Sequence, residues 1–155
     1  MGNTGIEIGQ ATADDLPAAA VLFDEYRQFY RQAPDPDGAA AFIGARLALG
    51  DSALFLARLD GAAAGFTQLY PSFSSVSMGR IFVLNDLYVR PDCRRRGVAD
   101  ALMRVAEEYA AAQGALRLAL STERGNATAQ ALYEQRGWQR DETYYHYEKS
   151  GRPAP

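Results

Sequence analysis

The sequence predicts a mixed α/β fold, with a central twisted sheet flanked by helices. Three observations predict it: short apolar segments that alternate like strands, longer segments with helical spacing of apolar residues, and turn residues between them. Sheets and helices of this kind bury their apolar faces against one another. Because 155 residues is a common size for one domain, we expect a single domain over 1–149 and a flexible tail over 150–155. The hydrophobic fraction of 48% is enough to bury a sizeable core.

The first third of the chain is predicted to hold a strand and two helices. Residues 6–11 alternate as a strand does. Thr12 and Asp15 have the spacing of a capping box, which indicates a helix from there to about Arg31. Two prolines end that helix, and a second helix is expected to end at Gly50.

The middle of the chain is predicted to form the sheet. Residues 53–59 and 63–70 read as strands joined at Asp60-Gly61, a strong hairpin signal. Residues 71–79 are serine-rich and loop-like, although Phe73 and Val76 could extend the sheet, and the next strand runs to Val89.

The last third alternates helices and strands. Apolar residues recur at helical spacing from Gly97 onward, and a short apolar strand is expected over 115–120. A helix over 126–136 and a closing strand over 138–148 complete the predicted order.

Composition and charge exclude several classes of protein. The single cysteine rules out an internal disulfide and suits a reducing cytoplasm, and one histidine without a Cys/His cluster argues against a metal site. The net charge of −3 argues against nucleic acid as the main partner. Neither a secretory leader nor an apolar run long enough for a membrane span is present, so we expect a cytoplasmic protein.

An arginine-rich loop between a strand and a helix is the most informative segment. Arg94, Gly97 and Ala99 fit the pattern R/Q-x-x-G-x-G/A, and Gly97 permits close approach of a ligand to the backbone. A helix that begins there offers unpaired N–H groups and the positive end of a dipole, which favour a phosphate. The local excess of arginine suits a small anion such as a pyrophosphate.

A second motif follows after one helix and one strand. Asn126, Tyr133, Gly137 and Trp138 fit the pattern N-x-x-A/S-x-x-x-Y-x-x-x-G-F/W, and Gln130 lies inside it. Asn126 is also a good helix N-cap, so it could serve as a cap, as a ligand-binding residue or as both. The alternative for Tyr133 is an ordinary core aromatic of its helix, but two motifs in this order and spacing favour a functional role.

Together the two motifs resemble those of the GCN5-related N-acetyltransferases (GNAT), over nearly the full chain. The resemblance implies direct transfer of an acetyl group from acetyl-CoA to a primary amine. It also implies coenzyme A-binding positions at Leu87, Tyr88, Val89, Arg94, Arg95, Arg96, Gly97, Val98, Ala99, Asn126, Gln130 and Tyr133. In this interpretation Leu87 N–H faces the thioester oxygen, and Tyr133 is the general acid that protonates the departing thiolate.

The general base has to remove a proton from the acceptor ammonium. An alkylammonium costs about 4–5 kcal/mol to deprotonate at pH 7. The segment 72–89 looks like the diamine and thialysine acetyltransferase branch, in which a glutamate stands at the place of Asn85. An amide cannot accept an ammonium proton, so we expect Asp86 to be the base, with Glu25, His146 or a water chain as alternatives.

The acceptor is expected to be a small primary amine, either amino-acid-like or polyamine-like. The candidate substrate-binding residues are Glu25, Tyr26, Tyr30, Tyr70, Phe73 and Asn85. Arg27 and Arg80 leave room for a substrate carboxylate. Two other functions stay open: an acyl-CoA-binding or regulatory module with little catalysis, and a peptide or protein N-acetyltransferase. A homodimer is possible.

Overall fold

The computed structural model describes residues 5–153, and two compact units divide between Ser121 and Thr122. The first unit contains a five-stranded sheet in the order β1-β2-β3-β4-β5, in which only the β4–β5 pair is parallel. Its strands are β1 (Ile6–Gln10), β2 (Ala53–Leu59), β3 (Ala62–Ser74), β4 (Gly79–Val89) and β5 (Leu118–Ala119). Its helices are η1 (Ala13–Asp15), α1 (Leu16–Phe29), α2 (Pro36–Leu49), η2 (Pro91–Cys93) and α3 (Val98–Ala112). The predicted mixed sheet flanked by helices is confirmed.

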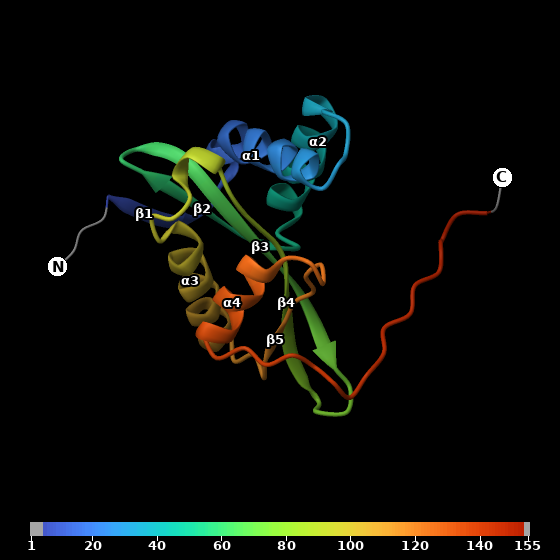
Figure 1. The fold of residues 1–155 in the computed structure, drawn as a ribbon. Coiled ribbons are helices and arrows are strands. Elements are labelled where there is room, and N and C mark those ends of the chain that lie inside the picture. Colours follow the sequence, from blue (N-terminus) through green and yellow to red (C-terminus); the bar gives the residue numbers. More distant parts are fainter. Residues whose placement is uncertain (1–4, 154–155) are drawn as a thin grey trace. The chain divides into compact units, whose positions relative to one another are not determined.

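The helices of this unit lie on both faces of the sheet (Figure 1). On one face, α1 packs against β3, where the rings of Tyr26 and Phe66 are 5.6 Å apart. On the other face, Tyr109 of α3 contacts Phe55 at 5.3 Å and Phe82 at 5.5 Å. Helices on both faces bury the sheet, and Phe66 is fully inaccessible to solvent.

Local signals explain where these elements begin and end. Thr12 and Asp15 form the predicted capping box ahead of α1. Asp35 caps α2 by accepting from the Gly38 N–H at 3.0 Å, and Gly50 ends that helix in the left-handed conformation. The Asp60-Gly61 hairpin is confirmed, with positive φ at both residues as a tight two-residue turn requires.

A buried carboxylate ties α1 to α2. Asp24 is 6% exposed and accepts a hydrogen bond from the backbone N–H of Asp35 at 3.1 Å. Arg27 Nη1 donates to Asp24 at 2.8 Å and to the Ala33 carbonyl at 3.0 Å. This arrangement fixes the connection between the two helices that cover one face of the sheet.

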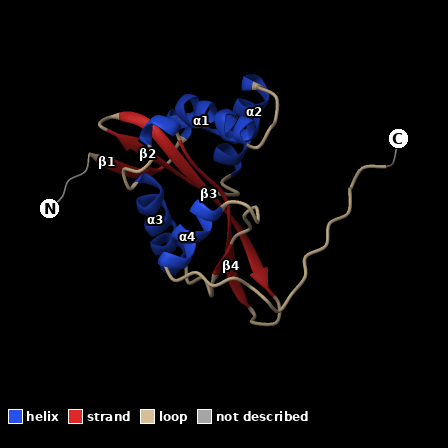
Figure 2. Cartoon of the chain, viewed as in Figure 1, coloured by secondary structure: helices blue, strands red, loops and turns tan. Residues whose placement is uncertain are grey.

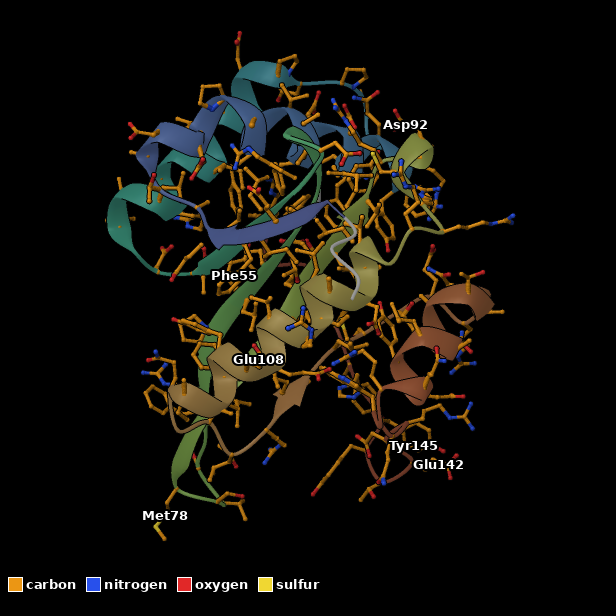
Figure 3. The ribbon with its side chains drawn as sticks, turned by 90° about the vertical axis from the view of Figure 1, so that its left-hand side faces the viewer. Phe55, Met78, Asp92, Glu108, Glu142 and Tyr145 are labelled. Carbon is orange, nitrogen blue, oxygen red and sulfur yellow. The ribbon has the colours of Figure 1, made fainter. Side chains whose placement is uncertain are left out.

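The β3–β4 hairpin extends further than the sequence predicted (Figure 2). Residues 71–74 belong to β3 and pair with β4 as far as Ser74 and Gly79, so most of the expected loop is strand. Met78 lies at the tip of this hairpin, at one end of β4, and Asp92 lies beyond the other end (Figure 3).

The second unit contains the helix α4 (Ala127–Gln135), which confirms the helix predicted there. The closing strand predicted over 138–148 is wrong, because none of these residues is in a strand in the structure. Alternating tyrosines favour a strand only where a neighbouring strand pairs with them, and residues 122–153 contain no strand. Of the predicted tail, Ala154 and Pro155 lie outside the described residues.

Candidate functional site

A β-bulge interrupts β4 at Asn85. Leu84 pairs with Leu69 and Asp86 pairs with Gln68, so Asn85 is an extra residue that faces no partner on β3. The two sides of the bulge differ in orientation: the ring of Phe82 contacts Tyr109 on the α3 face, whereas the ring of Tyr88 contacts Tyr26 on the α1 face. The inserted residue therefore reverses which side chains face which helix.

The bulge also decides which backbone groups of β4 face the strand's second edge. Arg90 N–H donates to the Ala64 carbonyl of β3, and the Tyr88 carbonyl also points toward β3, against Gly65. Backbone groups of alternate residues point to opposite sides of a strand, so those of Leu87 and Val89 point away from β3. Before the bulge the pattern is the opposite: the backbone N–H of the even-numbered Phe82 donates toward β5, to the Arg117 carbonyl.

This second edge of β4 is open beyond Val83. β5 pairs with β4 only at Phe82 and Val83, so no strand among residues 5–121 pairs with 84–89 on that side. An open strand edge presents unpaired N–H and C=O groups that can bind an extended ligand. The edge thus offers the backbone N–H and C=O of Leu87 and the backbone N–H of Val89.

The loop after β4 leads into the N-terminus of α3. Arg95 and Gly97 both have positive φ, at 61° and 85°, and no side chain caps the helix at Gly97. A β carbon at Gly97 would meet no protein atom within 4 Å. Val98 and Ala99 belong to the first turn, whose N–H groups lack intrahelical partners, and such a concave, electropositive backbone suits an anion.

The arginines of this loop have different surroundings. Arg94 Nε donates to the Val89 carbonyl at 2.9 Å, and its guanidinium lies 5.5 Å from the Phe29 ring. Arg96 is half-exposed and lies 3.8 Å from Asp60. Arg95 is exposed and forms no hydrogen bond or ion pair with the rest of the described chain. Arg94 is therefore bound to the open edge of β4, whereas Arg95 faces solvent.

A buried polar group lies on the α1 face beside the bulge. Asp86 is 3% exposed, and its carboxylate accepts from Gln68 Nε2 at 2.7 Å and from Asn85 Nδ2 at 3.0 Å. Gln68 is fully buried and its Oε1 accepts from Ser52 Oγ at 2.8 Å. The Tyr26 hydroxyl donates to the Asn85 carbonyl at 3.3 Å.

Two tyrosines next to this group have altered acidity. Burial raises the pKa of Tyr70 to about 12, and the negative charge of Asp86 adds to the effect. The pKa of Tyr26 is raised strongly by burial and then by Asp86. Both phenols therefore remain protonated donors at neutral pH.

The other candidate substrate-binding residues divide into two places. Tyr30 contacts Tyr26 with ring centroids 5.2 Å apart, so it joins the aromatic group of the α1 face. Phe73 does not: its ring stacks under Arg80 at 4.3 Å, and Arg80 also lies over Phe82 of the α3 face. The structure thus separates Phe73 and Arg80 from the tyrosines.

Glu25 is engaged by an arginine. Arg90 donates to both of its carboxylate oxygens, at 2.9 and 3.1 Å, and the Tyr88 hydroxyl donates to it at 3.2 Å. Asp24 similarly engages Arg27. The Glu25–Arg90 pair ties α1 to the end of β4, whereas the Asp24–Arg27 pair lies within α1. Asp86 differs from both carboxylates because no arginine of the described residues pairs with it.

The second motif lies in the second unit. Asn126 caps α4, since its side chain accepts from Ala129 N–H at 3.2 Å. Gln130 Nε2 donates to the carbonyls of Glu123 and Arg124, and Tyr133 contacts Trp138 with ring centroids 6.2 Å apart. The cap predicted at Asn126 is confirmed.

Gln68 and Ser52 were not predicted as site residues from the sequence. The available signal was a polar residue at a core position, because Gln68 alternates with Phe66 and Tyr70 on the inward face of its strand. Residues 5–153 contain no group of three or more His, Cys, Asp or Glu side chains that could hold a metal ion. No helix within the same range is long and apolar enough to cross a membrane.

Comparison with known proteins identifies the family. Residues 19–138 match the acetyltransferase (GNAT) family, a range that includes the open edge of β4, the arginine loop and α4. The chain belongs to this family. It is therefore an acetyl-CoA-dependent acetyltransferase.

Several relatives of this acetyltransferase are similar over most of its length. The uncharacterized N-acetyltransferase YhfO of Bacillus subtilis (strain 168) is 49% identical over 142 residues, 92% of this chain and 95% of that protein. The crystal structure of a probable acetyltransferase matches with a TM-score of 0.89 and 38% identity, covering 96% and 99% of the two chains. The aminoglycoside N(6′)-acetyltransferase type 1 of Klebsiella aerogenes is 30% identical over 96 residues, 61% of this chain and 63% of that protein.

Proposed function

We propose that this GNAT acetyltransferase moves an acetyl group from acetyl-CoA directly to a primary amine of a small molecule. The observation that carries the proposal is the open edge of β4, whose Leu87 and Val89 backbone groups lead to an uncapped helix N-terminus at Gly97. Such an edge suits the amide-containing pantetheine arm, and the helix N-terminus suits the pyrophosphate.

The residues of the arginine loop fit the charge and size of that pyrophosphate. The space in front of Gly97 is open, the first turn of α3 provides N–H donors, and the exposed Arg95 provides positive charge. Arg94 and Arg96 add two further cations. The proposed coenzyme-binding set also includes Tyr88, Val98, Ala99, Asn126 and Gln130.

Bound acetyl-CoA supplies an acetyl group activated as a thioester. Leu87 N–H, on the open edge of β4, would donate a hydrogen bond to the thioester oxygen and stabilise the charge that develops there. Tyr133 would supply the proton that the departing thiolate needs, because a phenol and a thiol have similar ordinary pKa values.

Asp86 takes the proton of the acceptor ammonium in this proposal. Its carboxylate accepts from the amides of Gln68 and Asn85 and has no arginine partner among the described residues, whereas the Arg90 ion pair occupies the alternative base Glu25. Tyr26, Tyr30 and Tyr70 border the same face and provide aromatic surface for a cationic amine. Segment 72–89 resembles the diamine and thialysine acetyltransferase branch, which favours a diamine or a lysine-like amino acid as the acceptor.

An amine panel tests the proposal. The purified protein is mixed with acetyl-CoA and with diamines, lysine-like amino acids, aminoglycosides or peptides, and release of coenzyme A thiol is followed. We expect turnover with diamines or lysine-like compounds. Turnover with aminoglycosides alone would favour the activity named in the Klebsiella relative. Binding of acetyl-CoA without turnover on any amine would favour a regulatory module.

A further inference from the structure

The carboxylate of Asp86 has no cationic partner in the described part of the chain. It accepts from the amides of Gln68 and Asn85 and interacts with the Tyr26 hydroxyl, and no Lys, Arg or His of residues 5–153 forms an ion pair with it. A buried charge without a counter-charge costs free energy, so an arrangement of this kind needs a compensating partner. The acceptor ammonium of the proposed function is a partner of the correct sign.

The orientation of the Gln68 amide is fixed at both ends. Ser52 Oγ donates to its oxygen, and its nitrogen donates to Asp86 and to the Tyr70 hydroxyl, 3.2 Å away. A carboxylate without a proton only accepts hydrogen bonds, so the Gln68 nitrogen must face Asp86. Reversal of the amide would bring its oxygen against the carboxylate and is therefore excluded.

The Asn85 amide, which lies on the bulge, is oriented by Asp86 in the same way. Asp86 accepts from Asn85 Nδ2 at 3.0 Å, so Asn85 Oδ1 is on the side of its amide that faces away from the carboxylate. Asn85 is exposed, and no residue of the described chain donates to its Oδ1. A hydrogen-bond acceptor of defined direction is thus presented to solvent beside a buried negative charge.

We propose that the contacts from Ser52 through Gln68 and Asp86 to Asn85 orient the Asn85 amide so that its Oδ1 binds the N–H of the acceptor amine. This inference rests on the proposed N-acetyltransferase function. Gln68 and Ser52 are positioning residues that act through Asp86, whose charge balances that of the ammonium. The arrangement selects charged alkylamines over aromatic amines, which are neutral at pH 7, and over hydroxyl groups.

Three variants test the chain of contacts. Gln68→Met keeps the length of the side chain but removes both donors, and misplacement of about 1 Å in a site costs about 10²-fold, so we expect kcat/KM for the amine to fall about 10- to 100-fold. Ser52→Ala removes one hydrogen bond and should lower kcat/KM for the amine roughly 2- to 10-fold. Asn85→Leu should raise KM for the amine, while the dissociation constant for acetyl-CoA stays unchanged in all three.

Thr67→Val is the matched control. Thr67 is buried beside Gln68 on the same strand, and its hydroxyl donates to the backbone carbonyl of Asp86 at 2.8 Å, not to the carboxylate. It should lose stability as Gln68→Met does, with kcat/KM within about twofold of wild type. The double variant that combines Gln68→Met with Asp86→Asn should have a kcat/KM no lower than that of Asp86→Asn alone. Gln68 acts through Asp86, so the two changes remove the same contribution to catalysis.

The outcomes separate this inference from the proposed function. A wild-type protein that acetylates no amine overturns the proposed function and this inference with it. An active wild type together with an unchanged kcat/KM in a folded Gln68→Met variant overturns this inference alone. Equal losses of kcat/KM in Thr67→Val and Gln68→Met would assign Gln68 a structural role and would also overturn this inference. So would a double variant whose loss of kcat/KM is the product of the two single losses.

Discussion

Phe82 and Tyr88 are both even-numbered residues of β4, yet their rings pack against opposite faces of the sheet. Phe82 contacts Tyr109 of α3 and Tyr88 contacts Tyr26 of α1. In an uninterrupted strand both rings would lie on one face. The extra residue Asn85 accounts for the reversal, and it turns the backbone groups of Leu87 and Val89 toward the open edge of the strand.

Gly97→Val should weaken acetyl-CoA binding at least tenfold. The new side chain would occupy the open space before the helix N-terminus and would keep the phosphate away from the N–H donors. The matched control is Gly114→Val at the other end of α3, where φ is also positive at 74° and the space is also open. Both variants should lose similar stability in thermal unfolding. Calorimetry that gives equal affinities for the two folded variants would contradict the prediction.

Tyr133→Phe should lower turnover about 10²- to 10⁴-fold with little change in coenzyme binding, because general acid catalysis contributes typically that much. Tyr145→Phe is the control in the same unit, since Tyr145 is 91% exposed. Single-turnover kinetics measure the chemical step directly. If both variants retain the wild-type rate of that step, Tyr133 is not the general acid.

Asp24→Ala should lower the free energy of unfolding by roughly 1–3 kcal/mol, because the Asp35 N–H and Arg27 lose the buried carboxylate that accepts from them. Urea denaturation measures the loss. Glu108→Ala is the control: Glu108 pairs with Arg104 at 3.5 Å on the exposed face of α3, and such surface pairs are worth about 0–1 kcal/mol. The prediction fails if the two losses are the same.

Stability should decline between pH 10 and pH 12, partly through Tyr70. The folded pKa of about 12 lies above the ordinary value of 10.0, so folding favours the protonated phenol. This contribution is fully present below pH 10 and is lost as the pH rises toward 12. Urea midpoints in this range should fall less steeply for Tyr70→Phe than for wild type. Parallel curves for the two proteins would show that Tyr70 has no such effect.

Local signals predicted most of the fold. The capping box at Thr12, the Asp60-Gly61 turn and the glycine before α3 act within a few neighbouring residues, so they can be recognised without a tertiary structure. The bulge could not be predicted in this way, because an extra residue is defined only by the register with β3. The partners of Gln68 were equally hidden, since Ser52 and Asp86 are distant in sequence. The single-domain boundary and the site roles stay predictions.

The bulge has a consequence for how β4 can change in evolution. A substitution at Asn85 alters one exposed side chain, whereas loss of that residue would turn every following side chain of the strand to the other face. Asp86 and Tyr88 would then point toward α3, and the groups of Leu87 and Val89 would turn toward β3. The number of residues in this strand is thus under stronger constraint than the identity of the residue at its midpoint, and insertions or deletions should be excluded from 80–90 even among distant active relatives.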